Sequence, residues 1–598
     1  MTENKQAFYK TKPFRFVLYG ILSFCFVWGY NEYFFDGNYL GNQSIFNIVL
    51  FLAGLLLMHT AGKITDKKIR LGSFVFGFFL SDILLMGHAL YVKGSLAALC
   101  NSPAGILRFL ISMAGFTTIL SCVLMLVIRY LPRIPKCTAE TQWKIYKYPL
   151  LSGILFFLSW LPAYLAYYPG VFAYDMDVQT REALGLTQMT KHHPPLHTIF
   201  WKLCLMFEEF SGLNALMIYS VCQMLLLATA LAFLIRFMVL QKWNNYLILG
   251  AVAFFCINPA VTLFSFIPTK DVFFTVCLIF FTIELCTFGI KRKENSTNVF
   301  GNLSLIIFGV LCCLFRNNMV YALIPAILLM LVLYRKYWKT FLLWLTCILL
   351  GYGLINGPVY TLLGIGEGNV REMLSVPMQQ ISCVIIEHKA ELSEADLAEA
   401  GRFLPVDSLN ELYNPRLADP VKIHFNTGNF QADKAGFIEL WLRLLIKYPL
   451  DYVNSFLNLN LPYWYPDANT NDEYSQRAYI ETYIYPKESS GYKVTRDSKL
   501  PFLFNIYERC ASYLLYDTMP LVANLFAIST PVWILILTMF LLVYQKKHTL
   551  ILSILPAFFY WCTFLLGPVS NFRYVFPIIV LYPLYVAFLL QKDASKKE

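Results

Sequence analysis

Long apolar runs recur along almost the whole chain, and they constrain the fold more than any other feature. About fourteen such runs lie between residues 14 and 591, and most approach the ~17 to 25 residues that a helix needs to cross a hydrocarbon core. Because 58% of the residues are hydrophobic and only 14% are charged, the chain is too apolar for a soluble globule of 598 residues. The runs are also too long for barrel strands. The sequence therefore predicts an all-α polytopic membrane protein.

Basic residues give the predicted orientation. The formal net charge is +11, but most Lys and Arg fall in short loops between apolar runs, where they favour the cytoplasmic side rather than a nucleic-acid partner. All basic loops and both termini lie inside only if the segment 195–212 does not cross the membrane. With that choice, we expect about fourteen transmembrane helices in a cell membrane, and one outer face that collects most of the remaining ionisable groups.

Composition divides the chain into four regions. Residues 1–145 carry accessory transmembrane helices with few polar groups. A transmembrane core covers 146–360, with a first outer loop at 169–195. Residues 361–518 form an outer-face, mainly helical region, because its helix-like patches are separated by Pro, Asn and Asp turns. The last helices and a basic cytoplasmic tail occupy 519–598.

The first outer loop holds the candidate catalytic residue, Asp175, in the motif YPGVFAYD. A Pro-Gly pair ends the preceding helix and lets the chain turn back along the membrane. Partial burial there is expected to raise the pKa of Asp175, so that it can take a proton from a nucleophile. The alternative is an Asp that caps a short interfacial helix.

Histidines close the same loop in KHHPPLH. Pro194 and Pro195 can begin a helix and leave His192 and His193 outside its positive end, where an anion would be met. His193 and His197 have a spacing that can share a metal on a helix. A Pro-Pro pair lies between them and no HExxH pattern is present, so we predict no protein metal site. Interfacial histidines satisfied by backbone or water are the alternative.

Further candidates for substrate binding lie at the outer ends of other apolar runs. Single basic residues there are usually anchors, but several on one outer face run against the positive-inside trend and favour a phosphate ligand. An acid beside one of them could be only a helix cap, and a glutamine in SVPMQQI could line a polar cavity or join helices. These candidates are Lys270, Asp271, Arg316, Gln379, Arg573 and Tyr574.

The order of these motifs resembles the GT-C superfamily of integral-membrane glycosyltransferases, especially the branch of protein O-mannosyltransferases and aminoarabinose transferases. The motifs YPG, YD, HHPPL, KDVFF, RNN, SVPMQQI and RYVFP are similar to those of an uncharacterised bacterial GT-C-like family. The resemblance covers about residues 147 to 591. Two departures are visible: the acid stands alone rather than in a DE pair, and the outer region does not match the known sugar-binding domains.

The resemblance implies a GT-C-like bundle in a bacterial plasma membrane. It implies transfer of a hexose or pentose from a polyprenyl-phosphate donor to a glycan, lipid or protein acceptor of the cell envelope. Asp175 would act as base or orient the acceptor, while Lys270 and Arg573, with His193 nearby, would hold the carrier phosphate. No cofactor is required, although a divalent cation is compatible with this chemistry. The alternatives are a transporter or flippase of lipid-linked glycans, and a polysaccharide polymerase or ligase.

Overall fold

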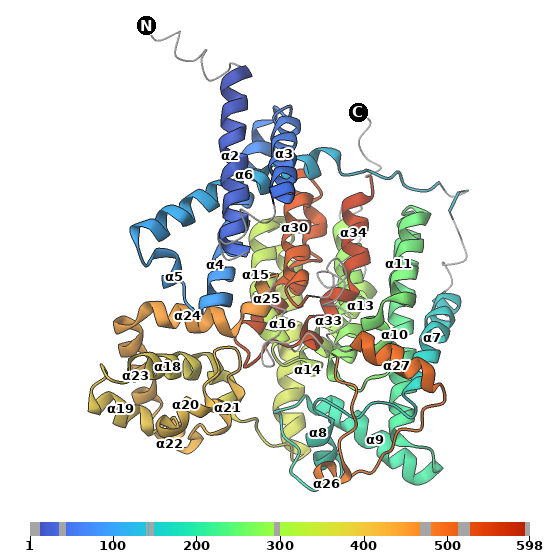
Figure 1. The fold of residues 1–598 in the computed structure, drawn as a ribbon. Helices are drawn as coiled ribbons and strands as arrows, with labels where there is room; N and C mark the ends of the chain where they lie inside the picture. Colours follow the sequence, from blue (N-terminus) through green and yellow to red (C-terminus); the bar gives the residue numbers. More distant parts are fainter. Residues whose placement is uncertain are drawn as a thin grey trace. The chain divides into compact units, whose positions relative to one another are not determined.

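The computed structural model describes residues 12–34, 44–138, 141–142, 149–291, 299–466, 480–511 and 527–592. Within these ranges the secondary structure is helical, and only isolated β-bridges, no sheet, are present. The chain divides into two compact units (Figure 1), each made of two stretches of sequence: residues 1–132 with 374–468, and residues 133–373 with 469–598. The prediction of an all-α membrane protein is confirmed.

The first unit combines long apolar helices with a set of short polar ones. The long helices are α2 (Lys12–Phe34), α3 (Ser44–Ala61), α4 (Lys67–Lys93) and α6 (Pro103–Tyr130), with the short α5 (Ala97–Cys100) between the last two. The second stretch adds α18 (Ser375–His388), α19 (Glu394–Gly401), α20 (Leu409–Leu412), α21 (Asp419–Ile423), α22 (Thr427–Ala432), α23 (Lys434–Lys447), α24 (Pro449–Leu459) and α25 (Leu461–Trp464).

Close packing of α2 against α6 depends on a missing side chain. A Cβ placed on Gly115 of α6 would lie 2.3 Å from the backbone nitrogen of Phe26. Small residues let apolar helices approach closely where no hydrophobic driving force separates lipid from protein. Helix α4 is delimited by local signals: the Asp66 side chain accepts from the backbone N–H groups of Lys68 and Ile69, and Gly94 ends the helix in the left-handed region.

The second unit contains the remaining helices. Its first stretch holds α7 (Pro149–Ala166), α8 (Met176–Ala183), α9 (Pro195–Ser211), α10 (Ala215–Leu240), α11 (Asn245–Ile257), α12 (Pro259–Phe266), α13 (Lys270–Lys291), α14 (Val299–Phe315), α15 (Met319–Leu333), α16 (Trp338–Leu354) and α17 (Tyr360–Leu362). Its second stretch holds α26 (Lys487–Ser490), α27 (Pro501–Ala511), α30 (Thr530–Tyr544), α31 (His548–Ile551), α32 (Leu555–Phe564), α33 (Phe572–Val580) and α34 (Tyr582–Leu590). Within this unit α10 packs against α7 and α13, and α13 packs against α14 (Figure 1).

Eight helices of the described chain are long and apolar enough to cross a membrane, or nine if α11 and α12, bent by 56°, form one span. Five shorter apolar helices accompany them. Together they cover the predicted runs, although for the run at 519–544 only residues from 527 onward are described. Helix α9, for which no crossing was predicted, is not among these candidate spans.

Candidate functional site

The loop that carries Asp175 is buried and pinned from both sides. After α7, Gly170 adopts a φ of +152°, and a Cβ there would meet the Ser220 hydroxyl at 2.8 Å, so the turn requires glycine. Phe172 then exchanges backbone hydrogen bonds with a segment more than 300 residues later: its N–H donates to the Tyr483 carbonyl (3.2 Å), and its carbonyl accepts from Tyr485 (2.9 Å). The predicted Pro-Gly turn therefore leads into a fixed support for Asp175.

Asp175 lies between two cations from different helices. Its Oδ2 is 2.8 Å from Lys270 Nζ at the start of α13. The Arg573 guanidinium of α33 donates to both carboxylate oxygens, at 3.0 Å from Nη1 and 3.2 Å from Nη2. The side chain makes no capping hydrogen bond to α8, so the capping alternative does not describe it. The predicted catalytic acid and two predicted phosphate ligands thus form one cluster.

The ionisation of Asp175 differs from the expectation. Burial by itself would raise the pKa of the Asp175 carboxyl, but the charges of Arg573 and Lys270, with a smaller effect of His193, hold it well below its usual value. The predicted upward shift was wrong, because it considered desolvation without the two opposite charges in direct contact. Asp175 is an ionised carboxylate in this arrangement, and a weak base as long as both cations stay on it.

His193 is the inner histidine of the pair. Lys270 Nζ lies 3.2 Å from its Nδ1, and since a lysine ammonium can only donate, Nδ1 accepts. Burial, followed by the Lys270 charge, lowers the pKa of His193 well below its usual value, so the ring is neutral. The neighbouring His192 is exposed, with its ring 4.4 Å from that of His193. His192 therefore lies at the solvent side of the cluster.

No group of three metal-ligating side chains occurs among the described residues. The ring nitrogens of His197 face Gln179 and the Tyr219 hydroxyl instead of His193. The ring of His197 is therefore used for hydrogen bonds within the protein.

A second ion pair adjoins the first. Asp271, whose side chain is fully buried, forms an ion pair with Arg316 and accepts a hydrogen bond from the Thr269 hydroxyl at 2.8 Å. The Arg316 guanidinium lies 4.5 Å from the centre of the Tyr574 ring, and Arg573 lies 5.1 Å from the same ring. Asp271 is thus more than a helix cap, and both guanidinium groups lie near the Tyr574 ring.

The five paired side chains leave one positive charge uncompensated, because Asp175 and Asp271 face Lys270, Arg316 and Arg573. We call this set, with His193, the charge cluster. The Nε of Arg573 is buried and has no hydrogen-bond partner in the described part of the chain. A buried donor without an acceptor costs free energy, and the excess charge has the sign that would attract an anion.

Sequence reasoning missed Glu481, which supports the loop. Its carboxylate accepts hydrogen bonds from the backbone N–H of Tyr174 (3.2 Å) and from the Tyr483 hydroxyl (2.8 Å), and its own N–H donates to the Tyr174 hydroxyl. The Tyr485 hydroxyl donates to the Tyr174 carbonyl at 3.1 Å. An acid among tyrosines in ETYIYP was the available signal, but nothing in the sequence connected it with a loop 307 residues earlier.

Gln379 is the one candidate outside this unit. It lies on α18 of the first unit, where its side-chain amide donates to the Asn414 carbonyl. The adjacent Gln380 donates to the Tyr452 carbonyl (3.2 Å) and accepts from the Trp441 indole (2.8 Å). These contacts correspond to the helix-packing alternative for the two glutamines.

Comparison with known proteins gives a family. No curated protein and no solved structure matches the chain. One family model matches residues 185–598, a stretch that contains every candidate site residue except Asp175. The chain therefore belongs to this family of unknown function, designated DUF6020.

Proposed function

We propose that this membrane protein is a GT-C-type glycosyltransferase that moves a sugar from a polyprenyl-phosphate donor to an acceptor on the outer face of a bacterial plasma membrane. The observation that carries the proposal is the position of Asp175 between Lys270 and Arg573. Glycosyl transfer from a lipid phosphate needs an acid for the nucleophile and cations for the leaving phosphate. Here both kinds of group are in direct contact.

The reaction follows from an exchange of partners within the cluster. A phosphate oxygen competes with Asp175 for Lys270 and for the unpartnered Nε of Arg573. As these cations turn to the phosphate, Asp175 loses the charges that depress its pKa. The acceptor hydroxyl then attacks the anomeric carbon and passes its proton to Asp175, while the bond between that carbon and the phosphate oxygen breaks. The phosphate leaves with the bonding electron pair and stays paired with the cations.

The helix inventory supports the finer architecture of the proposal. Among the described residues, eight helices are long and apolar enough to cross a membrane, the bent pair α11–α12 makes a ninth span if it counts as one, and five shorter apolar helices accompany them. With the five shorter helices also counted as crossings, the total is about fourteen, the number at which all basic loops lie inside. We therefore propose a GT-C-like bundle with both termini in the cytoplasm and with the charge cluster near the outer surface.

The test compares two aspartates of one short segment. The gene is deleted in its host and complemented with the wild-type chain, with Asp175→Asn or with Asp177→Asn, and envelope glycans are compared by mass spectrometry. Asp177 is a matched control because its carboxylate pairs locally with Arg181 at 3.1 Å. We expect one glycan species to disappear in the deletion strain and with Asp175→Asn, and to return with Asp177→Asn at equal membrane protein levels.

Full activity of Asp175→Asn would remove Asp175 from the mechanism. Binding of the donor provides the second arm: Lys270→Met and Arg573→Met are expected to weaken retention of a purified polyprenyl-phosphate sugar about tenfold or more. Unchanged donor affinity in both variants would contradict the phosphate assignment. A flippase would move its lipid-linked glycan intact, so the appearance of a new glycosidic bond in reconstituted vesicles separates transfer from transport.

A further inference from the structure

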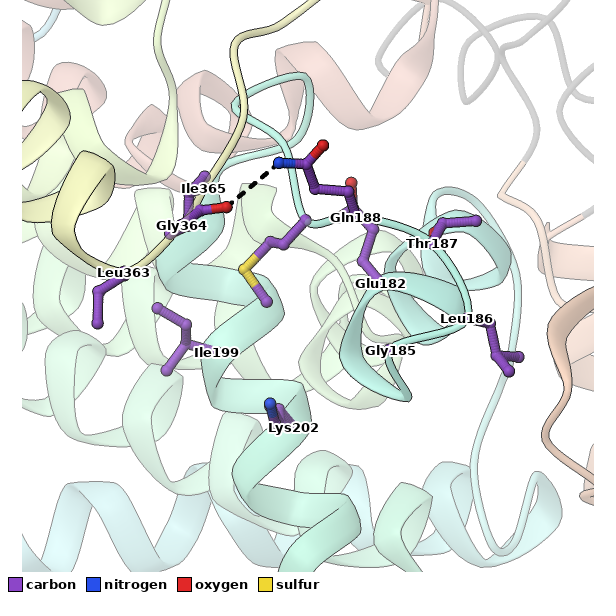
Figure 2. Close-up of a pocket in the computed structure, with 11 residues that line it drawn as sticks. Glu182, Gly185, Leu186, Thr187, Gln188, Ile199, Lys202, Leu363, Gly364 and Ile365 are labelled. Carbon is purple, nitrogen blue, oxygen red and sulfur yellow. Dashed lines mark hydrogen bonds between the residues drawn. The ribbon is translucent and has the colours of Figure 1, made fainter.

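A separate pocket opens at the other end of α8. Its walls are the loop that follows this helix, the first turns of α9 and the residues 363–365 (Figure 2). The cavity has a volume of about 490 Å³, within the range of small-molecule sites. None of the charge-cluster residues lines it. It is therefore a second place where a ligand could bind.

Hydrogen bonds fix the walls of this pocket. Glu182 Oε1 accepts from both the backbone N–H and the hydroxyl of Thr190, each at 3.1 Å. Gln188 Nε2 donates to the Gly364 carbonyl at 3.4 Å, a contact drawn in Figure 2. The N–H of Gly366 donates to the Met189 carbonyl at 2.9 Å. These hydrogen bonds join the loop after α8 to the segment after α17. The pocket is therefore preformed.

Glu182 also presents an unused acceptor. The side chain lines the pocket (Figure 2), although its residue is only 6% exposed. Its second oxygen, Oε2, is buried and has no hydrogen-bond partner within the described ranges. Burial raises the pKa of Glu182, which is the direction expected for a carboxyl that lacks a donor. Once the Glu182 side chain turns Oε2 toward the cavity, a ligand that supplies an N–H or O–H to this oxygen would remove the cost.

The rest of the lining has an amphiphilic character. Lys202 on α9 is exposed and provides one cation, while Leu186 and Leu363 are apolar and each about three-fifths exposed. The candidate span Arg335–Leu362 ends immediately before Leu363. The pocket therefore lies at one end of a candidate membrane span, where lipid head groups would be met.

We propose that this pocket binds the head group of a phospholipid that carries both a phosphate and a hydrogen-bond donor, such as the ammonium of phosphatidylethanolamine. The phosphate pairs with Lys202, the donor reaches Glu182 Oε2, and the first acyl carbons lie along Leu186 and Leu363. This site is distinct from the charge cluster. Its occupancy can be measured whether or not the protein transfers sugar.

The test uses two lipids that differ in the donor. Phosphatidylcholine keeps the phosphate and the positive charge but has no N–H, so it cannot satisfy Glu182 Oε2. The full-length protein is purified in detergent, delipidated and titrated with each lipid, and binding is read by native mass spectrometry. We expect phosphatidylethanolamine to bind about tenfold more tightly, the effect of one hydrogen bond to a charged group.

Four variants show which residue causes the lipid preference. Glu182→Gln should abolish the preference, whereas Glu209→Gln, the same change at an exposed position of α9, should keep it. Thr190→Val removes the hydroxyl that anchors Oε1 but leaves Oε2 in place, so it controls for loosening of the loop and should also keep the preference. Lys202→Met is expected to weaken both lipids to a similar extent.

Equal binding of the two lipids by the wild-type chain would overturn the proposal, as would a preference that survives Glu182→Gln. A soluble competitor separates the source of the head group. If free phosphoethanolamine binds as tightly as the lipid, the apolar rim contributes nothing and the lipid assignment is wrong. Weak competition by phosphoethanolamine supports a membrane lipid as the occupant.

Discussion

The two ends of helix α8 carry carboxylates with opposite environments, one mostly buried and one almost fully buried. Asp175, directly before the helix, has both oxygens engaged by Arg573, and Lys270 contacts one of them. Glu182, near its other end, has one oxygen on Thr190 and one without a partner among the described residues. The pKa of Asp175 lies well below its usual value, while burial raises that of Glu182. Burial alone thus does not decide whether an acid stays ionised; the charges in contact with it do.

Removal of a cation from Asp175 should reduce the free energy of unfolding more than any other change. Arg573→Met leaves Asp175 with Lys270 as its only strong partner in a largely buried site, and loss of one member of a buried pair costs about 3 to 5 kcal/mol. Unfolding of the purified protein in mixed micelles measures the loss.

The double variant Asp175→Asn with Arg573→Met serves as its control. It should recover part of the lost free energy of unfolding, because a neutral amide without its guanidinium costs less than a bare carboxylate. A double variant that is no more stable than Arg573→Met alone would show that the guanidinium acts through packing and not through Asp175.

Neutral substitutions of Asp175 and Glu182 should have different effects on the free energy of unfolding. At pH 7, Asp175→Asn loses charge-assisted hydrogen bonds and is expected to reduce the free energy of unfolding by about 2 to 3 kcal/mol. Glu182→Gln keeps an oxygen for Thr190 and removes a charge whose burial is only partly offset by Thr190 and Lys270, so its stability should equal or exceed that of the wild type. Equal losses in both variants would erase the distinction between the ends of α8.

The stability contributions of Glu182 and Asp175 should also depend on pH in opposite directions. The raised pKa of Glu182 stabilises the folded state at low pH, and this contribution is lost as the pH rises from about 4.3, the ordinary value, through the folded-state pKa. The advantage of Glu182→Gln over the wild type should therefore grow between pH 4 and pH 8 in thermal melts. The contribution of Asp175, whose pKa is depressed, is present above about pH 3.9 and is lost only in stronger acid.

A smaller loss of stability is expected when a hydrogen bond that supports the Asp175 loop is removed. Tyr483→Phe removes the hydroxyl that donates to Glu481 at 2.8 Å, and one such bond contributes about 1 kcal/mol. Tyr321→Phe, at an exposed hydroxyl of α15, is the matched control and should change little. If the two variants unfold alike, Glu481 does not hold the loop through Tyr483.

The smallest effect on stability is expected from an ion pair outside helix α8. Lys191 pairs with Glu367, whose side chain is 80% exposed. Glu367→Gln should therefore change the free energy of unfolding by no more than about 0.5 kcal/mol, and less at high salt. A loss near that of Asp175→Asn would mean that exposure is a poor guide to the worth of ion pairs in this protein.

The sequence placed the residues of the charge cluster on one predicted face, without predicting their contacts. Asp175, His193, Lys270 and Arg573 each adjoin an apolar run, and sorting basic loops to one side places such residues on the other. The contacts seen between them agree with that placement on a common side.

Other features could not be inferred in this way. Glu481 reaches the loop through backbone pairing between segments more than 300 residues apart, which local periodicity does not encode. The pKa of Asp175 depends on ångström-scale distances to two cations. The pocket depends on one unused oxygen of Glu182. For Gln379, an amphipathic pattern is equally compatible with a cavity and with helix packing, and only its partner decides.

The ion pair between Asp175 and Arg573 joins residues 398 positions apart. At the usual ~5 to 20 residues per second of synthesis, about 20 to 80 s separate the two residues at the ribosome. During that interval Asp175 is already made but lacks its guanidinium, and Lys270 is its one cationic partner for most of the time. The cluster is therefore completed only at the end of biogenesis. A nascent chain that stops before the last helices would insert in the membrane without an assembled site.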